Sequence, residues 1–140
     1  MNYLIIILIN KYLQFYNMNF NIIKLCIIVI LIDYFYLRLV SPHFKNLVKT
    51  IQKGEDMEFR MLPAVFCYIF LIYGLYYFII NKNGNYKDAF ILGFIIYGVF
   101  ETTNATIFKD WDFKSILIDT IWGGILFGLS TYIYNNYLKI

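Results

Sequence analysis

The sequence has few charged residues, since Asp, Glu, Lys and Arg make up 15% of its 140 residues. Soluble domains are about 25% charged and about 45–50% apolar, whereas 61% of this chain is hydrophobic and its mean hydropathy is +0.62. These values exclude a soluble globular domain and a disordered chain. The formal net charge of +3 is too small for an electrostatic grip on nucleic acid. The composition therefore predicts an integral membrane protein, with the lipid bilayer as its partner and no nucleic acid.

Cysteine and histidine are also scarce. Cys26 and Cys67 both lie in apolar runs, where a thiol packs as a small hydrophobic side chain, and two cysteines cannot form a structural zinc site. The lone His43 is expected at the surface and not on a metal. The sequence contains no Gly-rich phosphate loop, HExxH motif or nucleophile elbow. We therefore expect no cofactor and no resident metal, and no residue can be assigned a catalytic role.

Four apolar runs are long enough to cross a bilayer, which takes about 20 residues because a helix rises about 1.5 Å per residue. Backbone groups in lipid must pair within their own segment, so each run is predicted to be a helix. Asp112 is expected to cap the fourth helix. The fold class is therefore all-α, a bundle of four transmembrane helices that forms a single domain over residues 18–140. The predicted spans are residues 22–40, 62–80, 89–108 and 115–134.

Two further segments lie outside these spans. Residues 1–17 contain an apolar stretch too short to cross a bilayer, and they lack the basic flank and cleavage site of a signal peptide. They are either an interfacial segment or an extension upstream of a start at Met18. Between the first two spans, apolar residues follow the helical spacing i, i+3, i+4, i+7: Phe44, Leu47, Val48 and Ile51. This spacing predicts a short amphipathic helix on the membrane surface, with a solvated connector as the alternative.

The distribution of basic residues predicts the orientation in the membrane. In a four-span chain, the first and third connections share one side, and the termini share the other with the second connection. The first side has seven basic residues: Arg38, Lys45, Lys49, Lys53, Arg60, Lys109 and Lys114. The second side has five: Lys11, Lys24, Lys82, Lys87 and Lys139. Because basic residues favour the cytoplasmic side, both termini are predicted to lie on the non-cytoplasmic side.

Three acidic residues, Asp33, Glu101 and Asp119, lie inside the predicted spans, where an ionisable side chain costs roughly 2.5–3.5 kcal/mol. Each lies near a helix end on the side of the first and third connections. At 1.5 Å per residue they lie about 10, 10 and 6 Å from that side. The sequence therefore predicts a polar intramembrane site at this level. Asn104 and Trp122 share helix faces with two of the acids and complete it.

This group of acids has two interpretations. Carboxyl groups so close together cannot all stay ionised, so a cation, a proton or a basic partner would relieve their repulsion. Arg38 and Arg60 are the nearest internal candidates for a basic partner. In the alternative interpretation, the acids join helices through hydrogen bonds and bind nothing.

Small residues predict where helices pack closely. Thr120, Gly124 and Gly128 form a stripe on the fourth span, and such stripes let helix backbones approach one another. Gly93 and Gly98 are expected to serve the third span in the same way. The pattern favours tight packing without indicating whether the contact lies within one chain or between subunits.

The second half of the chain carries a specific pattern: Tyr97-Gly-Val-Phe-Glu-Thr-Thr-Asn-Ala-Thr-Ile, then Lys109-Asp-Trp, then Ile118-Asp-Thr-Ile-Trp-Gly-Gly124. From about Met18 to Tyr134 the chain resembles a family of small predicted membrane proteins, domain of unknown function 2177. That family shows a Tyr-Asp-Leu-Thr-Asn-like motif, a Trp in a short turn and an Asp-x-x-Trp-Gly motif. Its first span also carries an Asp, here Asp33.

The chain departs from the family pattern at Glu101, where Asp is usual, and at Thr102, where Leu is usual. The resemblance implies a four-helix membrane protein and suggests that Glu101, Asn104, Asp119 and Trp122 belong together. It implies no reaction, because the family has no established activity to carry over.

Three function classes follow from these observations. The first hypothesis is a small proton- or cation-coupled carrier with an acidic site in the membrane. Four helices are few for alternating access, so a homodimer is expected. The second is a membrane-embedded enzyme that acts on a lipid-like substrate through acid/base pairs. The third is a structural or assembly protein in which the acids only join helices. The sequence identifies no ligand.

Overall fold

The computed structural model describes residues 2–139, except the side chains of residues 2–4 and 15. Residue 1, which begins the predicted N-terminal segment, and residue 140, which ends the predicted domain, lie outside this range. The described chain is all-helical, and four helices are long and apolar enough to cross a membrane. They are α1 (Asn2–Ile51), α2 (Met61–Phe78), α3 (Tyr86–Ile107) and α4 (Phe113–Ile133). A 3-10 turn, η1 (Ile80–Lys82), follows α2, and a π-helical turn, η2 (Tyr134–Leu138), follows α4. The predicted fold class is confirmed.

Hydrogen bonds at the helix ends explain where α3 and α4 begin. The Asn85 side chain accepts hydrogen bonds from the backbone N–H groups of Lys87 and Asp88. The Asp112 side chain accepts one from the Ser115 N–H at 2.8 Å, which confirms the predicted cap. Such caps satisfy N–H groups that have no partner within the helix. The bounds of α2, α3 and α4 agree with the predicted spans to within three residues.

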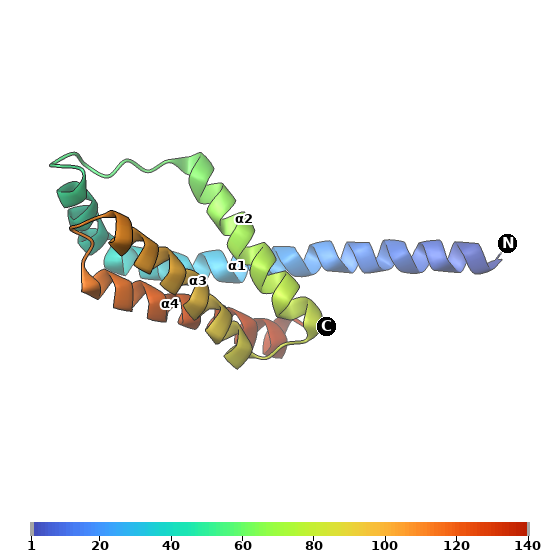
Figure 1. Ribbon diagram of the computed structural model, residues 1–140. Helices are drawn as coiled ribbons and strands as arrows, with labels where there is room; N and C mark the ends of the chain where they lie inside the picture. Colours follow the sequence, from blue (N-terminus) through green and yellow to red (C-terminus); the bar gives the residue numbers. More distant parts are fainter. Residues whose placement is uncertain (1, 140) are drawn as a thin grey trace.

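Helix α1 is much longer than its predicted span, since it runs for 50 residues and includes Pro42. Its N-terminal part extends beyond the other helices, and its C-terminal part, coloured teal, runs in a different direction (Figure 1). Pro42 lies inside the helix, before this last part. Proline lacks an N–H and its ring clashes with the preceding turn, so the helix bends there. The predicted amphipathic segment is helical, but it continues α1 after the bend and is not a separate helix.

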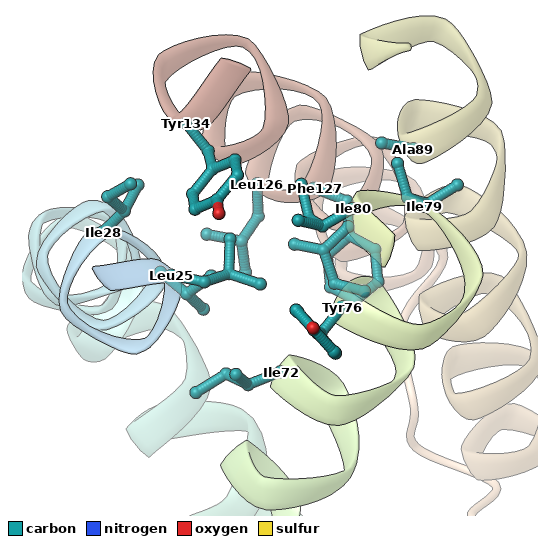
Figure 2. Packing of buried hydrophobic residues seen from close by; sticks show 12 residues of the cluster. Leu25, Ile28, Ile72, Tyr76, Ile79, Ile80, Ala89, Leu126, Phe127 and Tyr134 are labelled. Carbon is teal, nitrogen blue, oxygen red and sulfur yellow. The ribbon is translucent and has the colours of Figure 1, made fainter. Parts of the chain in front are cut away.

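The connections lie at the two ends of the bundle. The first and third connections are at one end, and the α2–α3 connection and the C-terminus are at the other (Figure 1). A buried apolar core lies toward the second end (Figure 2). Its members include Leu25 and Ile28 of α1, Ile72 and Tyr76 of α2, and Leu126 and Phe127 of α4. The end with the first and third connections is therefore left for polar groups.

Helices α3 and α4 approach each other closely along glycines. A Cβ atom on Gly93 would lie 2.1 Å from the carbonyl oxygen of Gly123, and one on Gly98 would lie 3.4 Å from the Thr120 methyl group. The stripe of Thr120, Gly124 and Gly128 therefore lies against α3 of the same chain. Only glycine lets the two backbones come so near at Gly93.

A methyl group at Gly93 is expected to destabilise the bundle. Gly93→Ala places its Cβ against a backbone carbonyl that cannot move aside, which costs about 1–3 kcal/mol. Thermal unfolding in detergent measures the loss. Gly74→Ala is the matched control, because a Cβ there meets no atom within 4 Å; it should be neutral or stabilise by up to about 1 kcal/mol. Equal unfolding temperatures for Gly93→Ala and the wild type would contradict the close approach.

Candidate functional site

Asp33 joins three helices through one carboxylate. The side chain is 6% exposed on α1. It accepts a hydrogen bond from the Tyr68 hydroxyl of α2 at 2.5 Å and another from the Trp122 indole N–H of α4 at 2.8 Å. Both oxygens of this buried carboxylate therefore have donors, which offsets part of its desolvation.

Asp119 is held by a second aromatic donor. It lies on α4 and accepts a hydrogen bond from the Tyr36 hydroxyl of α1. The Tyr36 ring stacks on the Trp122 ring, with centroids 4.1 Å apart and planes at 7°. Trp122 thus links the two carboxylates, because its N–H binds Asp33 and its face supports the ring that donates to Asp119.

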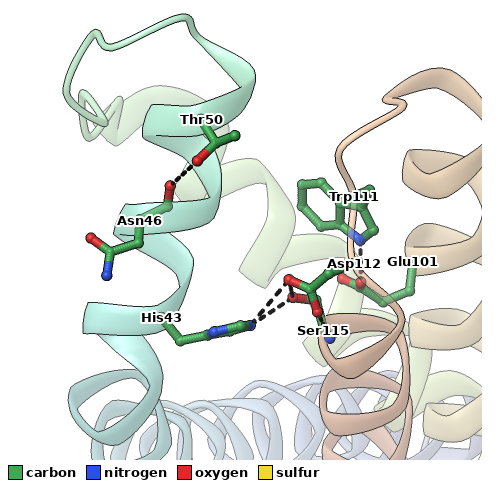
Figure 3. A network of polar contacts seen from close by, with 7 residues as sticks. All are labelled: His43, Asn46, Thr50, Glu101, Trp111, Asp112 and Ser115. Carbon is green, nitrogen blue, oxygen red and sulfur yellow. Dashed lines mark hydrogen bonds and ion pairs between the residues drawn. The ribbon is translucent and has the colours of Figure 1, made fainter.

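Glu101 is the most enclosed of the three acids, with 0% of the residue exposed. The Trp111 indole N–H donates to its Oε2 atom at 2.7 Å (Figure 3), whereas Oε1 receives no hydrogen bond from the described residues. Glu101 and Asp119 both contribute to the wall of one cavity. Two ionised carboxyl groups on one wall repel each other, so the pair is suited to binding a proton or a cation.

The donors around these acids are neutral. Among the described residues, ion pairs join only His43 to Asp112 and Lys49 to Asp56. Arg38 and Arg60, the nearest candidates for an internal basic partner, are exposed and pair with none of the acids. Arg38 follows Asp33 by five residues, which turns it about 140° around the helix.

The structure brings four of the five residues of the predicted polar site into this network. Asn104 is partly buried one turn beyond Glu101, and its side chain makes no hydrogen bond within the described chain. Sequence reasoning did not identify the donors Tyr36, Tyr68 and Trp111. Two signals were available: Tyr36 lies three residues after Asp33 and shares its face, and Trp111 is the Trp of the short turn in the family motif.

The bent end of α1 is anchored beside the start of α4. The Nε2 atom of His43 lies 2.8 Å from the Ser115 hydroxyl oxygen and 3.5 Å from the Asp112 carboxylate (Figure 3). Burial alone would raise the pKa of Asp112. Hydrogen bonds from Ser115 and the nearby His43 stabilise the carboxylate and hold that pKa below its ordinary value. His43 is thus a structural contact, with 31% of its side chain exposed.

Two cavities meet at Asp119. The larger, about 540 Å³, lies toward the first and third connections, and Glu101, Asp119 and Trp111 contribute to its wall. The smaller, about 170 Å³, lies deeper between α2 and α3, where it is lined by residues such as Cys67 and Ile96. Phe100 and Asp119 belong to both walls. No group of three or more His, Cys, Asp or Glu side chains within residues 2–139 is placed to hold a metal ion.

The fold and the buried polar network define an integral, multi-pass helical membrane protein. Residues 18–134 match the family described as predicted membrane protein, domain of unknown function 2177 (DUF2177). The chain therefore belongs to this family, and the resemblance inferred from the motifs is confirmed. No curated protein and no solved structure matches the chain.

Loss of one donor to Asp33 is expected to destabilise the fold. Tyr68→Phe removes only the hydroxyl that donates to this carboxylate, at a cost of about 1–2 kcal/mol in the free energy of unfolding. Tyr73→Phe is the matched control on the same helix, because Tyr73 is 58% exposed and makes no hydrogen bond with the described residues. Unfolding in detergent with increasing amounts of denaturant measures both variants. If the two variants are equally stable, the Tyr68–Asp33 bond does not support the fold.

Removal of the cap at Asp112 is expected to weaken the contact between α1 and α4. Asp112→Ala should cost about 0.5–2 kcal/mol at pH 7, while Ala at the exposed Asp110 should be neutral. Because the folded-state pKa of Asp112 is lowered, its contribution is complete above the ordinary Asp pKa of about 3.9 and is lost as the pH falls through the folded-state value. Thermal unfolding is measured at pH 7 and at pH 3. The difference in unfolding temperature between Asp112→Ala and the wild type should be smaller at pH 3. A difference that stays constant would show that the charge is not involved.

Proposed function

We propose that this membrane protein is a small carrier that binds and releases a proton or cation at the carboxyl pair of Glu101 and Asp119. The observation that carries the proposal is the position of Asp119 on the walls of both cavities. A ligand at this carboxyl group lies between a cavity toward one membrane face and a deeper cavity between α2 and α3. A carrier needs site residues that can be reached from both cavities.

The neutral donors support exchange at this pair. A buried acid with an ion-paired arginine would have to lose that partner before it could bind another cation, and breaking a buried pair costs about 3–5 kcal/mol. Here Tyr36 and Trp111 orient the carboxyl groups without neutralising them. A proton or cation can therefore enter and leave while these hydrogen bonds stay in place.

Asp33 has a different role in this proposal. Both of its oxygens already have donors from other helices, so it joins α1, α2 and α4 and does not exchange ligand. The third function class, in which acids only join helices, thus describes Asp33, whereas Glu101 keeps an oxygen without a donor. The proposed carrier works as a homodimer, with termini on the non-cytoplasmic side and the larger cavity toward the cytoplasm.

Flux through proteoliposomes tests the proposal. Vesicles containing a trapped pH dye are given a pH gradient, with valinomycin and K⁺ holding the membrane potential near zero, and the measurement is repeated with an opposing Na⁺ gradient. The wild type is expected to dissipate the pH gradient faster than protein-free vesicles. Glu101→Gln and Asp119→Asn remove the exchanging groups, and both should return the rate to the protein-free value.

The controls separate flux from folding. Asp110→Asn removes an exposed carboxyl group near the same connection and should keep the wild-type rate. Asp33→Asn should lower the unfolding temperature, because it disturbs the joint between helices. A wild-type rate equal to that of empty vesicles, or wild-type rates in both Glu101→Gln and Asp119→Asn, would refute the carrier.

A further inference from the structure

We propose that the larger cavity binds a small organic cation with an apolar body, its positive charge against Glu101 and Asp119. The inference rests on the proposed function in using the same carboxyl pair, and it names the substrate class. It is carried by the wall of the cavity, which combines buried carboxyl groups with aromatic rings.

The charge of the wall determines the sign of the ligand. Glu101 is fully buried, and its Oε1 atom receives no hydrogen bond from the described residues. Asp119 lies beside it on the same wall. Among the residues that line this cavity, Lys45 is the one basic side chain; it is exposed and makes no ion pair with the described acids. A cation would therefore compensate a buried negative charge, while an anion would face two carboxyl groups.

The rest of the wall determines the chemical class. Aromatic rings come from α1, the first connection, α3 and the third connection: Phe44, Phe59, Phe100 and Trp111. Ring faces attract cations, by about 2 kcal/mol or more when the cation is desolvated. An inorganic divalent ion prefers about six to eight oxygen ligands, and no group suited to a metal was found in the described chain. Aromatic walls with two carboxyl groups favour an ammonium or phosphonium ion carried on an apolar body.

The size of the cavity agrees with such a ligand. Its volume of about 540 Å³ lies within the range of about 300–1,000 Å³ that is usual for small-molecule sites. The bent end of α1, held by His43 on Ser115, provides part of the wall through Phe44 and Val48. The same ammonium chemistry occurs in water-soluble amines and in the ethanolamine headgroup of a lipid, so the test distinguishes these sources.

Equilibrium dialysis of the 140-residue chain in a maltoside detergent tests the inference. The probe is benzyltrimethylammonium, whose charge is permanent, and the control probe is benzylsulfonate, which has the same benzyl group and the opposite charge. Saturable binding of the cation and none of the anion is expected. Glu101→Gln combined with Asp119→Asn should weaken cation binding about tenfold or more, while Asp110→Asn should bind as the wild type does.

Several outcomes overturn the inference: no saturable binding of the cation, equal binding of both probes, or wild-type affinity in the double variant. If the double variant does not fold, the comparison of the two probes on the wild type still decides the sign of the ligand. Phosphatidylethanolamine is then added to the micelles to identify the source of the ammonium group. If the lipid displaces benzyltrimethylammonium, the ligand is the lipid headgroup; if it does not, the ligand is a soluble amine. The binding experiment needs no ion gradient. If the cation binds but the vesicles show no flux, the carrier function is refuted and the cation site is not.

Discussion

The close approach of α3 and α4 along glycines is the constraint on which the rest of the structure depends. Gly93 lies against the carbonyl of Gly123, and Gly98 faces Thr120. Thr120 follows Asp119 directly, and Glu101 lies three residues after Gly98, so this contact places the two carboxyl groups on the wall of the same cavity. In lipid there is no hydrophobic effect to press helices together, and packing of small residues supplies the attraction instead. A wider separation at the glycines would divide the carboxyl pair.

The second constraint is that buried carboxyl groups need donors. Arginine or lysine is the usual partner of a buried acid, yet here the donors are Tyr36, Tyr68, Trp111 and Trp122. Neutral donors satisfy oxygen atoms without cancelling their charge, so the acids keep their capacity to attract a cation or share a proton. The arrangement also separates two tasks, because Asp33 is fully hydrogen-bonded between helices while Glu101 keeps an oxygen that faces no donor.

Hydropathy was sufficient to predict α2, α3 and α4, because a bilayer imposes both the length of a span and its helical structure. The extent of α1 could not be predicted in the same way. A proline usually marks the end of a helix, but at Pro42 the helix bends and continues. His43 holds the bent end on Ser115. That bond joins residues far apart in the sequence, so no local pattern indicates it. Arg38 and Arg60, the nearest candidates for a basic partner, do not pair with the acids for a related reason: proximity along the chain does not determine which way a side chain points.

The sequence by itself determined the fold class and the family, and it predicted a shared depth for three acids. Each of these depends on a local quantity: the hydropathy of a segment, a motif, or the rise per residue of a helix. Only the tertiary structure decided which donors hold each acid, that Asn104 stays outside the network, and that Asp119 borders two cavities. Those facts depend on how the helices are rotated and how closely they approach. Rotation and approach are decided by contacts between distant residues, and depth alone does not determine them.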